Sequence, residues 1–292
     1  MRRFIFNLFI FLIITLLFNF VVFVFANDNY YKGYTDFPDK SYHSFIIADS
    51  HGLALEDFPD QLGVYNFSAS SDSYLDMKRK VVYLIDNHYK VDKIYLTVDG
   101  HTLSPYRYQY NNSDKSIIYT SEVNFNYVKE RYLKYYFPIF QVKVIPLLKI
   151  YLENKVKSAF QQKSKTANIF WTDLSEKERI KRAKERVVGQ FPTEDKSEDL
   201  EKTLLEIIDL CKTNNIELIG LKFPLSRNYL DLMGKRNYGA DKLFISKGLK
   251  VLDGESIFKN RDDYFGDHDH LNSKGAKVFI DFIEIKKTPL KK

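Results

Sequence analysis

Four clusters of polar residues in this sequence contain the side chains that acyl-transfer chemistry uses. Three follow apolar runs: Asp49-Ser50-His51, the segment 66–73, and Asp99-Gly100-His101. The fourth, Asp267-His268-Asp269-His270, precedes a helix-patterned segment. Serine attack on an ester needs a base that takes the serine proton, a carboxylate that orients the base, and hydrogen-bond donors for the oxyanion. The four clusters supply candidates for each of these roles.

The elements that must position these clusters alternate along the chain. Apolar runs predict strands at 44–48, 64–67, 93–98, 217–222 and 250–252, and three- and four-residue apolar spacing predicts helices at 72–89, 199–213 and 272–285. We expect Asp72 or Ser71 to cap the first of these helices. The alternation predicts an α/β fold with a parallel sheet covered on both faces. Functional groups gather at the carboxyl ends of such strands, where three of the four clusters fall.

The alternation stops between residues 104 and 198, which we interpret as an insertion. This segment is aromatic-rich and basic, with a helical pattern over 128–157 that is interrupted at Pro138 and Pro146. Dense mixed charge over 172–189 is typical of a solvated helix. The insertion is either an extra helical layer or a functional surface, namely a lid, a polymer-binding surface or a docking face for a membrane partner. The sequence leaves these alternatives open.

The N-terminus indicates export. Arg2 and Arg3 precede an apolar run over residues 4–26, which is long enough to cross a bilayer as a helix. We predict an uncleaved signal anchor over 1–26, although the end of the run also resembles a signal-peptide cleavage site. A stalk over 27–41 and an α/β domain over 42–292 would follow. The basic end should stay cytoplasmic, which makes the domain extracytoplasmic, either periplasmic or on the cell surface.

Composition bounds the remaining possibilities. The chain has 292 residues, 45% of them hydrophobic, which suffices for a single globular core. The formal net charge is +6, but basic residues are interspersed with acidic ones, so a mixed solvated surface is favoured over a nucleic-acid partner. The single cysteine, Cys211, rules out an internal disulfide.

The polar clusters resemble, in order, the sequence blocks of the SGNH (GDSL-type) hydrolase superfamily. Ala48-Asp49-Ser50-His51 is similar to its Gly-Asp-Ser nucleophile block, and Ser71 stands where its second block carries an oxyanion-binding Gly. The third block departs from the family, because residues 98–103 lack the usual Asn. The last block matches best: Asp267-x-x-His270-Leu271-Asn272 fits the family's Asp-x-x-His segment. The resemblance covers residues 44–98 and 218–285.

The resemblance implies a flavodoxin-like three-layer α/β/α fold with a Ser-His-Asp triad and neither metal nor cofactor. Ser50 would attack the acyl carbonyl, His270 would shuttle the proton, and Asp267 would orient the imidazole. The backbone N–H groups of Ser50 and Ser71 would bind the oxyanion, and His101 would supply a third donor in place of the missing Asn.

Membrane-anchored, exported members of the family imply a function at the cell surface. We expect a serine esterase or O-acyltransferase that acts on acetyl-type groups of a cell-surface polysaccharide or acylated glycan, beside a membrane-bound O-acyltransferase. Two alternatives stay open. The altered third block is also what a catalytically impaired accessory or glycan-binding subunit would show, and carboxylates with imidazoles over 267–270 are possible zinc or manganese ligands.

Overall fold

The computed structural model describes residues 1–56, 58, 63–121, 123–160 and 171–283. The chain folds into two compact units. Unit 1 contains Met1–Phe37 and Asp114–Ala167, and unit 2 contains Pro38–Ser113 and Asn168–Lys292. The predicted insertion is thereby divided. Its central part groups with the N-terminal helix, and both of its ends group with the sheet.

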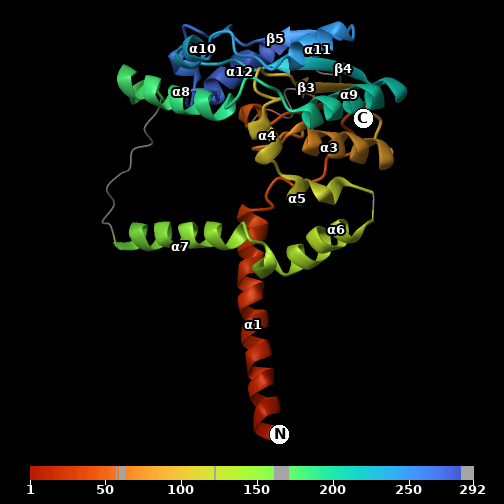
Figure 1. Cartoon of the computed structure of the whole chain (residues 1–292), viewed down its shortest axis with the longest axis vertical. Coiled ribbons are helices and arrows are strands. Elements are labelled where there is room, and N and C mark those ends of the chain that lie inside the picture. The colour runs from red at the N-terminus through yellow and green to blue at the C-terminus, as the bar shows by residue number, and fades with distance from the viewer. Residues whose placement is uncertain (57, 59–62, 122, 161–170, 284–292) are drawn as a thin grey trace. The chain divides into compact units, whose positions relative to one another are not determined.

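Unit 2 is built on a parallel sheet, seen edge-on in Figure 1. Within the described residues the sheet has five strands, which are β1 (Ser44–Ile47), β2 (Tyr65–Asn66), β3 (Lys93–Thr97), β4 (Glu217–Lys222) and β5 (Val251–Asp253). Their spatial order is β2-β1-β3-β4-β5, and every neighbouring pair is parallel. This is the flavodoxin-like order, so the predicted α/β class and the five predicted strands are confirmed.

Helices cover both faces of this sheet. The helices among the described residues of unit 2 are η1 (Ser50–Leu55), α3 (Tyr74–Asp86), α4 (Pro105–Gln109), η5 (Trp171–Asp173), α8 (Glu176–Gln190), α9 (Glu198–Thr213), α10 (Arg227–Met233), α11 (Ala240–Ser246), η6 (Asp262–Tyr264) and α12 (Ser273–Ile283). Ile46, Tyr95 and Ile219 are in register across three strands and share a buried cluster with Phe279 of α12. Gly220 alternates with them, and a Cβ there would meet a side chain of α11 at 3.0 Å. The faces are therefore covered by different helices, which makes three layers. The last two residues of the helix predicted over 272–285 lie outside the described residues.

The predicted cap of α3 is wrong by one or two positions. Ser73 caps the helix in a capping box, because its hydroxyl and N–H both contact Asp76 Oδ2 at 2.9 Å. Asp72 does not cap the helix. Its carboxylate instead accepts a hydrogen bond from the buried Lys80 Nζ at 2.6 Å.

The charge-dense stretch over 172–189 is only partly a solvated helix. It forms α8, whose Ala183, Val187 and Gln190 are buried. Ala183 and Val187 share a cluster with Tyr229 of α10. The prediction missed this buried face because small apolar residues at three- and four-residue spacing are outnumbered by charged ones.

Unit 1 contains α1 (Arg2–Asn29), α5 (Ser113–Ser116), η2 (Ile117–Tyr119), α6 (Phe125–Tyr127), η3 (Val128–Lys134), η4 (Pro138–Phe140) and α7 (Val144–Phe160), with Ser113 contributed by unit 2. Val22, Phe25 and Ala26 of α1 pack with Tyr31 and Val144 in a buried cluster. The helix predicted over 128–157 is broken into η3, η4 and α7. The two prolines account for the breaks, because a proline lacks the backbone N–H that continues a helix but is tolerated in a first turn.

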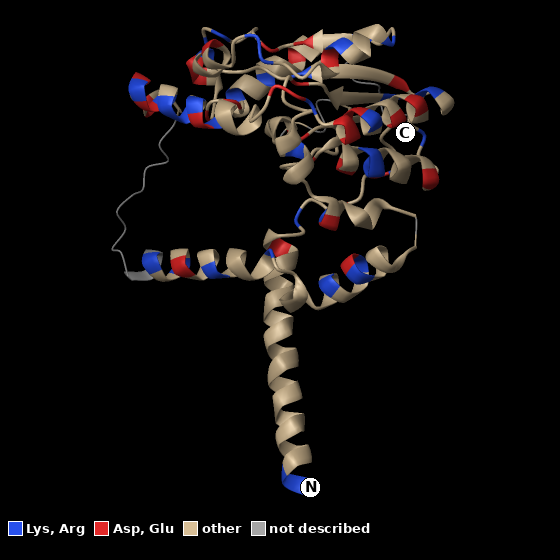
Figure 2. Cartoon of the chain, viewed as in Figure 1, with Lys and Arg blue, Asp and Glu red and all other residues tan. Residues whose placement is uncertain are grey.

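Among the described residues, α1 is the one helix that is long and apolar enough to cross a membrane. Its most apolar window has a mean hydropathy of 3.0. Figure 2 shows that α1 is charged only near its ends, whereas Lys and Arg alternate with Asp and Glu over unit 2. A membrane anchor and a signal sequence share these properties of α1.

Candidate active site

Ser50 lies at the turn that follows β1. Asp49 caps η1, and its carboxylate accepts a backbone N–H two residues ahead at 3.0 Å. Ser50 is the first residue of η1, so its N–H has no acceptor within the helix. The turn is tight, because a Cβ on Gly52 would lie 2.2 Å from Ser68 Oγ. Asn66 stabilises the same turn by donating from Nδ2 to Gly52 O at 2.8 Å.

Ser50, His270 and Asp267 are joined by hydrogen bonds. His270 Nε2 lies 2.8 Å from Ser50 Oγ, although the two residues are 220 positions apart. His270 Nδ1 lies 2.9 and 3.0 Å from the two carboxylate oxygens of Asp267. This geometry meets the requirements of a serine nucleophile, with a base in reach of the hydroxyl and a carboxylate on the base's other nitrogen.

Neighbouring carboxylates set the protonation of His270. Burial lowers the pKa of His270, but contacts with Asp267 and Asp269 raise it, and the net pKa lies above its usual value. Burial raises the pKa of Asp267, while the rings of His268 and His270 lower it, and the net pKa lies below its usual range. Asp267 is therefore an anion at neutral pH, placed where its charge favours the protonated form of the His270 ring.

The loop that carries Asp267 and His270 is closed by short-range bonds. Gly266 N donates to His270 O at 2.9 Å, and His270 N donates to Asp267 Oδ1 at 2.9 Å. The following helix packs against the base of the loop, where a Cβ on Gly275 would lie 2.2 Å from Tyr264 O. The glycine allows this close approach, which fixes the imidazole relative to α12.

A second carboxylate, Asp269, also lies close to the imidazole. Its Oδ1 is 3.1 Å from His270 Nδ1, but without the alignment of a hydrogen bond. Its Oδ2 accepts hydrogen bonds from Arg186 Nε at 2.7 Å and Gln190 Nε2 at 3.2 Å. Asp267 is thus the better-aligned partner of His270, and the buried Asp269 connects the loop to α8.

His51 is the centre of a buried charged network. Its Nδ1 lies 2.7 Å from Asp99 Oδ2, and its Nε2 lies 3.4 Å from Asp269 Oδ2. Its ring packs against that of His270 with centroids 5.2 Å apart. Burial lowers the pKa of His51, but Asp49, Asp269 and Asp99 raise it, and the net pKa lies well above its usual value. The raised pKa favours an imidazolium at His51, held between carboxylates and beside the ring of His270.

Asp99 ties together the carboxyl ends of three strands. It follows β3 and accepts a hydrogen bond from the N–H of Phe223, which follows β4, at 2.8 Å. The same carboxylate binds His51, which follows β1, and Thr97 Oγ1 at 3.1 Å. The cluster predicted as a departure from the family's third block thus fixes the edge of the sheet on which Ser50 stands.

His101 belongs to the same buried network and contacts Asp49 and Arg107. Its Nε2 lies 3.1 Å from Asp49 Oδ2 and 3.1 Å from a terminal nitrogen of Arg107, which also donates to Asp49. Burial lowers the pKa of His101 to about 4, so the ring is neutral at pH 7. Burial raises the pKa of Asp49, but Arg107 and His51 hold it well below its usual value. The assignment of His101 as an oxyanion donor stays a prediction, and the structure gives its Nε2 different partners.

Ser71, the second predicted oxyanion donor, has a left-handed backbone with a φ of 68°. Residues other than glycine adopt this conformation at a cost of about 1 kcal/mol. The position is the one at which the resembled family carries glycine. Ser71 therefore keeps the backbone geometry that a glycine adopts freely. The role of its N–H as an oxyanion donor stays a prediction.

Three groups of carboxylates and imidazoles come close enough to share a metal ion: Asp49 with His51 and His101, His51 with Asp269 and His270, and Asp267 with His268 and Asp269. The first two groups already contain cations, because Arg107 and Arg186 occupy the carboxylates and His51 is protonated. A metal ion there would meet positive charge rather than free ligands. A metal ion would therefore compete with these arginines for Asp49 and Asp269, and the expectation of a metal-free triad stays a prediction.

Sequence reasoning missed the partners Asp269, Arg186 and Arg107. Asp269 was visible only as one acid among several in the last cluster. The two arginines lie on α8 and α4, in the segment that was interpreted as an insertion. The sequence signal that could have placed Arg186 near the site was the short buried stripe of α8, which lies beside it.

Comparisons with known proteins add little to this geometry. No family model matches the sequence, and no curated protein matches it. One similar solved structure is a candidate acylhydrolase from Bacteroides fragilis NCTC 9343, with 11% identity and a TM-score of 0.40. The match covers 90% of this chain and 97% of that chain. At this level of similarity the case for chemistry depends on the residues around Ser50.

Proposed function

We propose that the protein is a membrane-anchored, extracytoplasmic serine esterase or O-acyltransferase of the SGNH type. The observation that carries the proposal is the hydrogen-bonded series Ser50, His270 and Asp267. It stands at the carboxyl edge of a parallel sheet with the flavodoxin-like strand order. The order of the sequence blocks along the chain supports the family.

In the first step, Ser50 Oγ attacks the acyl carbonyl carbon while His270 Nε2 takes the serine proton. The oxyanion that forms is bound by the N–H groups of Ser50 and Ser71. The imidazolium is stabilised by Asp267 and then gives its proton to the leaving alcohol oxygen as the ester C–O bond breaks. An acyl-enzyme on Ser50 remains.

In the second step, a hydroxyl group loses its proton to His270 and attacks the acyl carbonyl. The bond to Ser50 Oγ breaks, and His270 returns the proton to that oxygen. Water as the nucleophile makes the protein an esterase, and a sugar hydroxyl makes it an O-acyltransferase. The same residues serve both reactions.

The packing of α1 supports an uncleaved anchor. Val22, Phe25 and Ala26 are buried in the unit 1 cluster, so cleavage after Ala26 would remove three members of that cluster. Asn19 Nδ2 also donates to Tyr136 O at 2.9 Å. The basic Arg2 and Arg3 favour a cytoplasmic N-terminus, and this supports the proposal that the site lies outside the cytoplasm.

For the substrate, we propose acetyl-type groups of a cell-surface polysaccharide or acylated glycan, with a membrane-bound O-acyltransferase as partner. This part depends on the resemblance to anchored, exported family members. One observation favours the alternative of a catalytically impaired accessory or glycan-binding subunit. The third block lacks its Asn, and Asp99 and His101 are committed to the buried network.

A turnover assay separates the two functions. The full-length chain in detergent should hydrolyse an activated acetyl ester, and Ser50→Ala should abolish this hydrolysis. Ser246→Ala is the matched control, because Ser246 is an exposed serine on α11. An inert wild-type chain that binds an acylated glycan tightly would contradict the enzyme and support the accessory subunit.

A further inference from the structure

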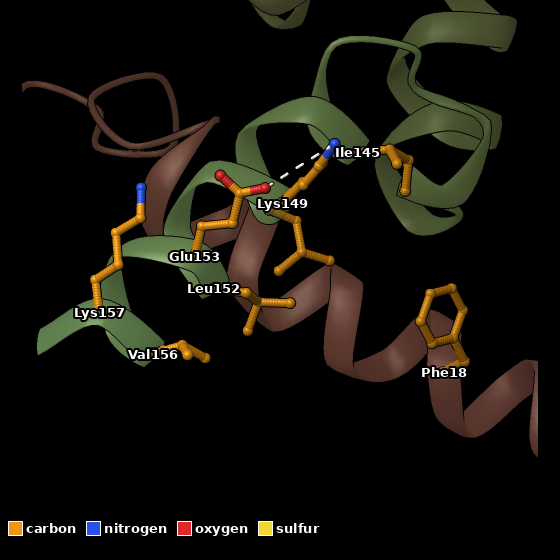
Figure 3. Close-up of a pocket in the computed structure, with 8 residues that line it drawn as sticks. Phe18, Ile145, Lys149, Leu152, Glu153, Val156 and Lys157 are labelled. Atoms are coloured by element: carbon orange, nitrogen blue, oxygen red, sulfur yellow. Dashed lines mark ion pairs between the residues drawn. The ribbon is translucent and has the colours of Figure 1, made fainter. Parts of the chain in front are cut away.

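An apolar groove lies between α1 and α7 in unit 1. Figure 3 shows it lined by Phe18 of α1 and by Ile145, Leu152 and Val156 of α7, with Lys149 and Glu153 paired at its margin. Its volume is about 520 Å³. The three α7 side chains are 41%, 51% and 54% exposed, which is unusual for a cluster of large apolar residues in water.

The groove lies on the side of α7 that faces the N-terminal end of α1. Tyr151 of α7 contacts Phe25 of α1 with ring centroids 5.2 Å apart, whereas the groove is lined by Phe18. Phe18 precedes Phe25 by two helical turns, or about 10 Å along α1. Ile145, Leu152 and Val156 therefore face back along the apolar length of α1.

With α1 as a membrane span, this position along the helix corresponds to the edge of a bilayer. A hydrocarbon core about 30 Å thick takes about 20 helical residues, so a span that begins at Phe4 ends near Phe23. Phe18 and Phe25 lie on either side of that point. An element that packs between them stands at the boundary between acyl chains and headgroups.

We propose that α7 lies in the membrane interface and that its groove face contacts the acyl chains of the leaflet at the C-terminal end of α1. The inference rests on the proposed anchoring of α1. It goes beyond anchoring because it assigns a second, interfacial membrane-binding element to this chain.

Two further features fit a lipid surface. Residues 123–157 contain seven Lys and Arg but two Glu, a balance that favours anionic headgroups. Tyr132, Tyr136 and Phe140, in the segment before α7, are about half exposed, and Tyr136 stacks on Phe23 of α1. Aromatic side chains at this depth are typical of the membrane interface.

Single cysteines carrying a fluorescent probe test the proposal by depth-dependent quenching. The full-length chain is reconstituted into vesicles of phosphatidylcholine and phosphatidylglycerol, with a nitroxide near either the headgroup end or the methyl end of the acyl chain. The probe is placed by Leu152→Cys, Val156→Cys, Leu12→Cys or Ser246→Cys. The native Cys211 gives little background, because it is buried and burial raises its pKa to about 12.

The expected result is loss of most fluorescence at Leu152→Cys and Val156→Cys with the shallow nitroxide. Leu12→Cys, in the middle of α1, should lose most with the deep nitroxide, and Ser246→Cys should lose little with either. If the probe is quenched at Leu12→Cys but not at Leu152→Cys or Val156→Cys, the proposal that α7 lies in the membrane interface is wrong, and α7 faces water or protein. An unquenched Leu12→Cys would instead overturn the anchor itself.

Discussion

The carboxyl edge of the sheet in unit 2 and the helices of unit 1 depart from the usual distribution of side chains in opposite ways. Around Ser50, carboxylates are buried, with Asp49, Asp99 and Asp269 at most 2% exposed. In unit 1, Phe125 and Val142 are 83% and 80% exposed. Charged groups are seldom buried unless paired, and large apolar patches seldom face water. The first region therefore holds paired charges beside the proposed nucleophile, and the second suits apolar surroundings.

The largest expected effect is on turnover, when the proposed base, His270, is removed from the buried polar region. His270→Ala should lower kcat for an activated acetyl ester by about a thousandfold or more, because Ser50 then has no proton acceptor. The His270 side chain is only 26% exposed, so the melting temperature of the variant is measured at the same time to show that it stays folded at the assay temperature. His43→Ala, at a half-exposed histidine, is the control. A kcat within tenfold of wild type would remove His270 from the mechanism.

Replacing the two acids beside His270 should have different effects, because Asp269 matters mainly for stability and Asp267 mainly for turnover. Asp269→Asn removes the carboxylate that pairs with Arg186 and one of the three carboxylates around His51, and should cost about 3 to 5 kcal/mol of unfolding free energy. Asp267→Asn changes a side chain that is 47% exposed, so it should lower kcat about a hundredfold or more with little loss of stability. Chemical denaturation and ester turnover of both variants measure the contrast. Equal stability losses would show that the buried network is not specially dependent on Asp269.

The activity should fall on the acid side with a midpoint above pH 6.5, because the base must be neutral and the pKa of His270 is raised from 6.5. Asp267→Asn removes part of what raises that pKa, so the residual activity of this variant should have a lower midpoint. The pH profile of kcat/KM measures both. An acid limb in wild type below pH 6.5 would contradict the electrostatic account of the site.

A smaller effect is expected on stability against pH. Burial lowers the pKa of His268, but Asp267 and Asp269 raise it, to a net value of about 9. Its raised pKa adds stability that is fully present below the unfolded value near 6.5 and is lost as the pH rises to about 9. His268→Gln should flatten the fall in melting temperature over this window. An unchanged slope would assign the fall to other groups, of which His51 is the first candidate.

The smallest expected effect concerns Ser71. Ser71→Gly should relieve the left-handed backbone and change the unfolding free energy by no more than about 1 kcal/mol in either direction, since glycine also gains freedom in the unfolded chain. Activity should be retained, because the proposed donor is the backbone N–H. A large loss of turnover would indicate that the Ser71 side chain itself takes part.

Local patterns predicted most of the sheet and the position of its polar clusters. The strand at Glu217–Lys222 has the predicted bounds, because a buried parallel strand is an almost continuous apolar run. Ser50, His270 and Asp267 were likewise identified from their blocks, and the structure brings them within hydrogen-bond distance. Their catalytic roles remain to be tested.

Long-range pairing could not be predicted in the same way. Arg186 meets Asp269 across 83 positions, and Arg107 meets Asp49 across 58. A charged residue in a sequence window looks solvated by default, and a partner far along the chain leaves no periodic signal. The cap of α3 was misplaced for a related reason, because the carboxylate of Asp72 is taken by Lys80.

The most direct test of the central claim is the site at which a serine-directed fluorophosphonate modifies the full-length folded chain in detergent, mapped by peptide mass spectrometry. We predict a single adduct on Ser50 that is lost in His270→Ala, because the reagent needs a hydroxyl activated by a base. An unmodified Ser50 in the folded chain, or an adduct on another serine, would contradict the assignment of Ser50 as the nucleophile.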